Sequence, residues 1–132
     1  MHLTLVRLAF VYLLIGMLLG IGMGAAGDFT LRPVHAHVNL LGWAVLVVAG
    51  LLVRAYPGLE QDRLFRTFCR LYNLAMPASM VALAVMLAAV RDPHAGSALA
   101  HTMKGLSIVA TLGVIASIGL LLAALGRQPR GA

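Results

Sequence analysis

The chain has 132 residues, of which 61% are hydrophobic and 11% are charged, and its formal net charge is +6. A soluble domain of this size needs more charged side chains to cover its surface. The composition therefore excludes an ordinary soluble protein and indicates one whose solvent is lipid. The basic residues lie beside apolar runs, where they contact lipid headgroups, which argues against nucleic-acid binding. The single cysteine, Cys69, excludes an internal disulfide.

Four apolar runs have the length, roughly 20 residues, that a membrane-spanning helix needs. They cover Leu8 to Ala26, Val34 to Val53, Leu71 to Val90 and Leu99 to Leu125. The first run resembles a signal peptide in having a basic residue before it and small residues at its end, but we expect it to be retained as a helix. The sequence predicts one all-α integral membrane domain, a bundle of four transmembrane helices over residues 1–132.

The distribution of basic residues predicts the orientation of these helices. Seven lie at the end that holds both termini and the middle loop: Arg7, Arg54, Arg63, Arg66, Arg70, Arg127 and Arg130. Three lie at the other end: Arg32, Arg91 and Lys104. Because positive residues stay on the cytoplasmic side, we expect both termini inside (N-in/C-in). We expect a bacterial inner membrane protein whose two short loops face the periplasm.

Histidines are the most informative polar residues of the chain, since ionisable side chains in membrane segments are costly and mark function by default. Of the five histidines, His2 lies in the N-terminal tail. The predicted topology places His35, His37, His94 and His101 on the outer side. On a regular helix His35 and His37 point about 200° apart, so they are expected to serve two different sites.

A glycine follows a histidine at the start of both the second and the fourth run. Asn39 and Gly42 share the helix face of His35, and Gly105 follows His101 on its face. A glycine below a histidine leaves space for a flat group. A b-type haem fits this arrangement, because two neutral imidazoles from different helices bind its iron axially while the porphyrin lies between them. We therefore expect His35 and His101 to be the haem ligands.

Two basic residues near the same end are candidate partners of the haem propionates. Arg32 precedes the second run and Lys104 follows His101 by three residues. The less specific interpretations stay open: each histidine can be an interfacial or hydrogen-bonded residue, and Lys104 can extend to the membrane surface.

The first run carries glycines at four-residue spacing, Gly16, Gly20 and Gly24. Such a face lets helices pack closely, either within the chain or between copies of it. We expect a homo-oligomer, a dimer or a trimer, with His37 near an inter-subunit contact or a second site, where it too is a candidate metal ligand.

The segment from His35 to Trp43, His-Ala-His-Val-Asn-Leu-Leu-Gly-Trp, together with the preceding Leu31 to Val34, resembles the second helix of subunit I of the haem–copper oxidases. The similarity is greatest to the cbb3-type oxidases and nitric oxide reductases. The resemblance implies that His35 is an axial ligand of a low-spin haem. It covers about a dozen residues, and the chain has too few helices and histidines for a complete haem–copper centre. His101 as second ligand is an inference and matches no motif.

Three functions follow as hypotheses. The first is a haem-binding membrane protein that carries electrons to a redox partner or senses a small gas. The second is a copper or zinc site built from the same histidines, to which His94 would contribute more. The third is a cofactor-free accessory subunit of a larger membrane complex. Catalysis is not indicated, because the four acids, Asp28, Glu60, Asp62 and Asp92, all lie in loops.

Overall fold

The computed structural model describes residues 1–92 and 96–128. It has four helical segments that are long and apolar enough to cross a membrane, and the described residues form no strand. These segments are α1 (His2–Ala26), a second span (Arg32–Ala55), α4 (Arg63–Arg91) and α5 (Ser97–Gly126). The expected all-helical architecture with four candidate spans is confirmed.

The second span is not one regular helix. It consists of α2 (Arg32–His37), the π-helical segment η1 (Val38–Val45) and α3 (Leu46–Ala55). A short 3₁₀ helix, η2 (Pro57–Gln61), then leads to α4. A π-helix shifts the backbone hydrogen bonds from i→i+4 to i→i+5, so the side chains that follow His37 do not keep the face that a regular helix gives them.

Each helix extends beyond its apolar run, and α4 shows why. The Asp62 carboxylate accepts hydrogen bonds from the backbone N–H groups of Leu64 at 2.6 Å and Phe65 at 3.3 Å. This cap starts α4 at Arg63, eight residues before the apolar run that begins at Leu71. Hydropathy alone does not detect a cap that precedes charged helical residues.

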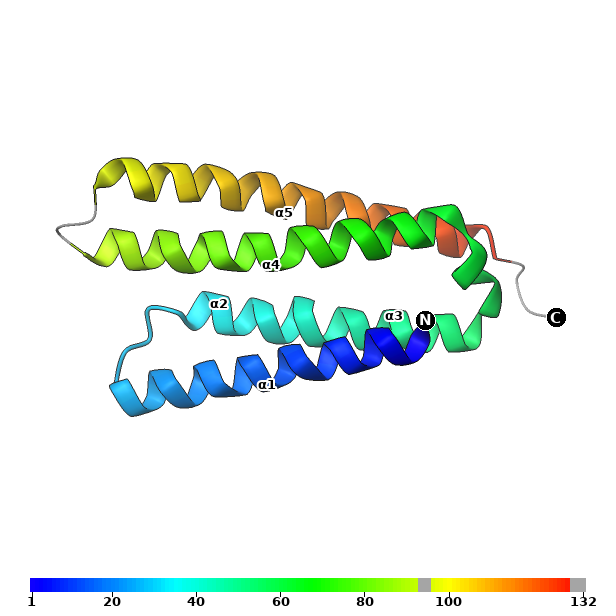
Figure 1. Ribbon diagram of the computed structural model, residues 1–132, viewed down its shortest axis with the longest axis horizontal. Coiled ribbons are helices and arrows are strands. Elements are labelled where there is room, and N and C mark those ends of the chain that lie inside the picture. Colours follow the sequence, from blue (N-terminus) through cyan, green and yellow to red (C-terminus); the bar gives the residue numbers. More distant parts are fainter. Residues whose placement is uncertain (93–95, 129–132) are drawn as a thin grey trace.

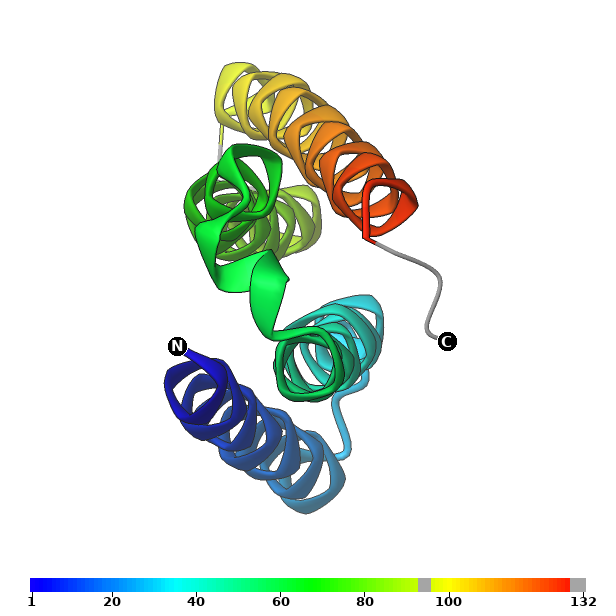
Figure 2. The same ribbon diagram turned by 90° about the vertical axis from the view of Figure 1, so that its right-hand side faces the viewer.

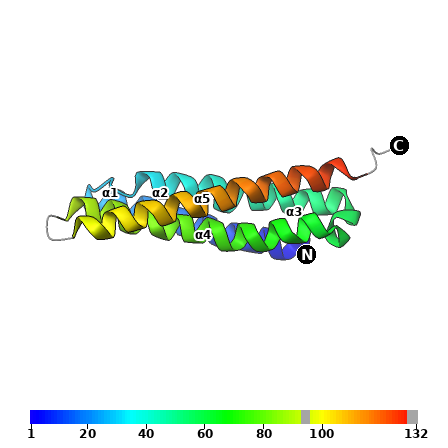
Figure 3. The same ribbon diagram turned by 90° about the horizontal axis from the view of Figure 1, so that it is seen from above.

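The helices form two antiparallel hairpins (Figure 1), one of α1 with the second span and one of α4 with α5. Seen along the helices, they form a staggered row with α1 and α5 on the outside (Figure 2). Seen from above, all four run along the same long axis (Figure 3). We call the end where α1 finishes at Ala26 and α5 starts at Ser97 the loop end, and the end that holds the N-terminus and η2 the terminal end.

The second span and α4 join the two hairpins at the centre of the row. Buried aromatic side chains of α4 lie here, with ring centroids 5.6 Å apart for Phe65 and Phe68 and 5.4 Å apart for Phe68 and Tyr72. The Tyr72 hydroxyl donates a hydrogen bond of 2.7 Å to the backbone carbonyl of Leu41, within the π-helical segment. A hydrogen bond between α4 and the second span thus joins the two hairpins within an otherwise apolar contact.

The outer helices of the row expose apolar side chains, as expected for contact with a lipid bilayer. On α1 these include Phe10, Leu14, Leu18 and Ile21, and on α5 Ile108, Val109, Leu112 and Ile115. In water such continuous apolar faces would be unfavourable.

At Gly16, α1 lies close against the second span. Gly16 is buried, and a Cβ atom at this position would overlap the Asn39 side chain. At Gly20 a Cβ would lie 3.0 Å from Cε1 of His35. By contrast, nothing lies within 4 Å of a Cβ at Gly24. The four-residue glycine spacing therefore serves contact within the chain at its first two positions.

We expect Gly16→Ala to destabilise the protein and Gly24→Ala to leave it unchanged or slightly more stable. The new methyl group at position 16 meets Asn39, and overpacking of this kind costs about 1–3 kcal/mol. At position 24 the methyl group meets nothing, and alanine is the better helix former. Thermal unfolding of both variants in the same detergent measures the difference. Equal midpoints for the two would contradict the close approach.

Candidate functional site

His35 lies near the start of the second span, and its ring is directed at α1. Pro33 occupies the first turn of α2, where no backbone hydrogen bond is lost. Two residues further, Nδ1 of His35 lies 2.8 Å from the backbone carbonyl oxygen of Gly16. A carbonyl only accepts hydrogen bonds, so Nδ1 carries the hydrogen and the neutral ring keeps a lone pair on Nε2. This tautomer is the one that binds a metal through Nε2.

Asn39, one turn after His35, also lies in the contact between the second span and α1. Its Nδ2 donates to the backbone carbonyl of His35 at 3.0 Å and lies 3.4 Å from Nε2 of the ring. Asn39 occupies the space beside Gly16, and His35 occupies the space beside Gly20. Both side chains are therefore used to pack α2 and η1 against α1.

His37 is exposed on another side of the second span. Its Nδ1 lies 2.7 Å from the backbone carbonyl oxygen of Pro33, one turn earlier in the same helix. By the same reasoning Nδ1 is the donor, and Nε2 keeps its lone pair. His35 and His37 thus share one hydrogen-bonding arrangement, but His37 is exposed whereas His35 is half-buried.

His101 is exposed on α5 and lines a hollow of about 420 Å³ between the loop-end halves of α4 and α5. Lys104 lines the same hollow. Nothing lies within 4 Å of a Cβ built at Gly105, so the surface beside His101 is open.

The structure does not bring the two expected haem ligands together within one chain. His35 is held against α1, whereas His101 lies on α5, which packs along α4. The two rings are therefore on different hairpins and do not face a common slot. Gly42 also does not leave the expected space, because a Cβ there would lie 2.7 Å from Tyr12 and 2.9 Å from Met76.

The basic residues of the loop end have different surroundings. Arg32 is exposed, and its guanidinium lies 5.2 Å from the centroid of the Phe29 ring. Lys104 is exposed beside His101. His94 lies outside the described residues.

An ion pair that the sequence analysis missed joins the two hairpins at the loop end. Arg91, the last residue of α4, pairs with the carboxylate of Asp28 and donates to the hydroxyl of Thr30 at 2.9 Å. The pKa of Asp28 is lowered to about 2, mainly by the hydrogen bonds that the Thr30 hydroxyl and N–H donate to its carboxylate. The hydrogen bond from Arg91 makes a smaller contribution. The carboxylate therefore stays charged at neutral pH. The sequence could have indicated this pair, because it places the acidic Asp28 and the basic Arg91 in the two loops predicted at the same end.

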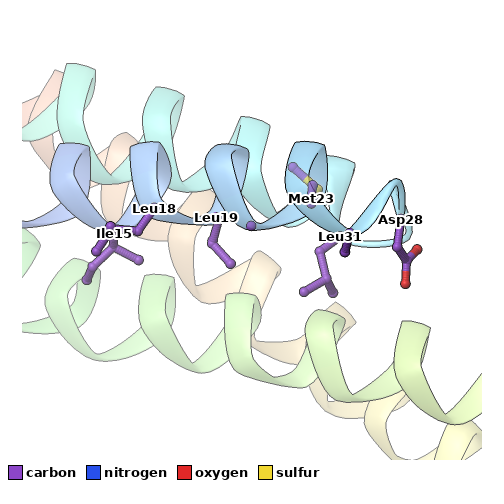
Figure 4. A pocket seen from close by; sticks show the side chains of 8 residues that line it. Ile15, Leu18, Leu19, Met23, Asp28 and Leu31 are labelled. Atoms are coloured by element: carbon purple, nitrogen blue, oxygen red, sulfur yellow. The ribbon is translucent and has the colours of Figure 1, made fainter.

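An apolar hollow of about 470 Å³ lies along α1 at the loop end (Figure 4). Its labelled lining includes Ile15, Leu19, Met23 and Leu31. Asp28 is its one ionisable lining residue, and Arg91 already pairs with it. The residues that line this hollow include no histidine or cysteine.

In residues 1–92 and 96–128, no group of three or more His, Cys, Asp or Glu side chains is placed to hold a metal ion. A haem needs only two axial protein ligands, whereas a compact zinc site is usually closed by four ligands and a catalytic one by three.

The fold and these surfaces define a small all-helical protein whose four apolar helices suit a lipid bilayer. A family model described as "Protein of unknown function (DUF2871)" matches residues 3–128. The chain belongs to this family. Comparison with curated proteins gives no match. Comparison with solved structures gives none either.

Proposed function

We propose that this protein binds b-type haem at the loop end of its helices and that the bound haem carries electrons. The observation that supports the proposal is the shared arrangement of His35 and His37. Each places Nδ1 against a backbone carbonyl oxygen, at 2.8 Å and 2.7 Å, which leaves Nε2 as the lone-pair donor. A metal-binding histidine is commonly oriented by such a second bond, which also makes Nε2 a better ligand.

Exposure favours His37 and His101 as the ligand pair. Both rings are exposed, whereas the ring of His35 is packed between Gly20 and Asn39. His37 lies five residues after the start of its span at Arg32, and His101 four residues after Ser97. With a rise of 1.5 Å per residue, both lie about 6–8 Å from the start of their helices. Each ring therefore lies within the first two turns of its helix, near the loop end.

The two ligands would come from two copies of the chain. Within one copy His37 and His101 belong to different hairpins, and both are exposed. A second copy packed against this end could place its His101 opposite His37 of the first, and a two-fold axis would repeat the pair. The open surface at Gly105 gives space for the flat ring. The homo-oligomer expected from the sequence would thus be part of the site.

The remaining residues of the site would orient the imidazole of His37 and the haem. His35 and Asn39 fix the rotation of the second span against α1, which directs His37 outward. Lys104, beside His101, and Arg32, at the start of α2, supply positive charge for the propionates. His37 and His101 would hold the haem, and a haem held by two imidazoles would supply one-electron transfer rather than gas binding.

We further propose an inner-membrane location with both termini in the cytoplasm and the haem site on the periplasmic side. The terminal end carries Arg7, Arg54, Arg63, Arg66, Arg70 and Arg127, whereas the loop end carries Arg32, Arg91 and Lys104. A fluorescent protein fused to the C-terminus should fluoresce, and alkaline phosphatase fused after Arg91 should be active. The reverse pattern would show the opposite orientation.

The haem proposal is tested by the visible spectrum of the protein purified after expression with added haem. Wild type should show a Soret band and, when reduced, the sharp α band of a bis-histidine haem. His37→Ala and His101→Ala should each lose most of the band. Leu40→Ala, a truncation of an exposed side chain on the same span, should keep it and serves as the control.

Co-expression of the two histidine variants with different tags tests the pairing between copies. Purified through both tags, the mixed dimer has one intact site, so it should regain about half of the wild-type haem per chain. No recovery would show that the ligands belong to one chain. Loss of the band in His35→Ala with retention in His37→Ala would assign the ligand to His35. Absence of a Soret band in wild type would remove the haem function.

A further inference from the structure

Three arginines follow one face of the first turns of α4 at the terminal end. Arg63, Arg66 and Arg70, together with Thr67, line a hollow of about 330 Å³. Their spacing of three and four residues brings the side chains to one side of the helix. All three arginines are exposed. We call these four residues the arginine cluster.

The acidic residues nearest in sequence have partners other than the arginines of the cluster. The Asp62 carboxylate caps α4 by accepting from the N–H groups of Leu64 and Phe65. Glu60 forms its ion pair with the N-terminal amine, 2.9 Å away. The remaining acids, Asp28 and Asp92, lie at the opposite end of the helices. Over the described part of the chain, the structure shows no ion pair of these arginines with an acidic side chain.

The length of α4 places the cluster at the depth of lipid headgroups. Its 29 residues span about 43 Å at 1.5 Å per residue, whereas the hydrocarbon core of a bilayer is about 30 Å thick. At the other end the apolar residues continue up to Val90, next to the final Arg91. The surplus of about 13 Å, roughly nine residues, therefore falls on the segment that holds the arginine cluster.

We propose that the arginine cluster binds the phosphate group of an anionic phospholipid. Guanidinium groups bind phosphate oxygens through paired, charge-assisted hydrogen bonds. The Thr67 hydroxyl lies within the cluster, but it donates its hydrogen to the backbone carbonyl of Arg63 at 2.9 Å, so the arginines supply the hydrogen-bond donors for the phosphate. The position of the hollow at the membrane surface assigns the phosphate to a lipid rather than to a soluble molecule. This site is independent of the haem proposal.

The test compares Arg63→Gln/Arg66→Gln/Arg70→Gln with Arg7→Gln/Arg54→Gln/Arg127→Gln. The second variant loses the same charge from the same end of the molecule but leaves the cluster intact. Native mass spectrometry counts bound phosphatidylglycerol and phosphatidylcholine on each protein, and thermal unfolding in detergent with each lipid measures stabilisation. Wild type and the control variant should retain phosphatidylglycerol over phosphatidylcholine. The cluster variant should bind it about tenfold or more weakly.

The arms of the experiment separate the competing explanations. Equal loss of phosphatidylglycerol in both variants would show a general charge effect and overturn the site. Unchanged binding in the cluster variant would also overturn it. Inorganic phosphate at millimolar concentration should not reproduce the stabilisation, and if it does so fully, the lipid assignment is wrong.

Discussion

The close approach of α1 and the second span at Gly16 is the contact on which the arrangement of the loop end depends. A side chain at this position would overlap Asn39, so the absence of one allows Asn39 and His35 to lie between the helices. There Nδ1 of His35 reaches the carbonyl oxygen of Gly16. Polar groups inside a membrane need partners, and the bond gives one to the imidazole. The contact also fixes the rotation of the second span, which leaves His37 exposed.

The functional proposal follows from that rotation. One histidine of the His-x-His segment holds two helices together, and the other presents a correctly oriented nitrogen at the surface. His101 is exposed at the start of another helix, beside the open position of Gly105. Two exposed imidazoles near the loop end on different hairpins suit a cofactor shared between copies better than one enclosed within a single chain. The arginine cluster at the other end concerns contact with the bilayer and does not depend on this conclusion.

The sequence predicted the helices well, because hydropathy over about 20 residues directly reflects the length of a membrane span. It placed their ends less well, since the Asp62 cap starts α4 among charged residues. The pairing of His35 with His101 assumed a regular second helix and a closed bundle. Periodicity cannot show the π-helical segment from Val38 to Val45, nor which neighbour a face meets. The Gly16–Gly20 spacing indicated close packing, but its partner, the face of His35 and Asn39, became visible only in three dimensions.

Disulfide formation across the α1–second span contact tests this arrangement most directly, in a background where Cys69 is replaced by alanine. The Gly16→Cys/Asn39→Cys pair should cross-link rapidly under mild oxidation, because a Cβ at position 16 would lie 2.7 Å from the Cγ atom of Asn39. The control is the pair Gly16→Cys/Leu40→Cys, in which Asn39 is also replaced by alanine. Leu40 is the next residue of the π-helical segment, and its side chain is 65% exposed. This second pair should not cross-link within the chain. Faster cross-linking at position 40 than at position 39 would contradict the rotation of the second span.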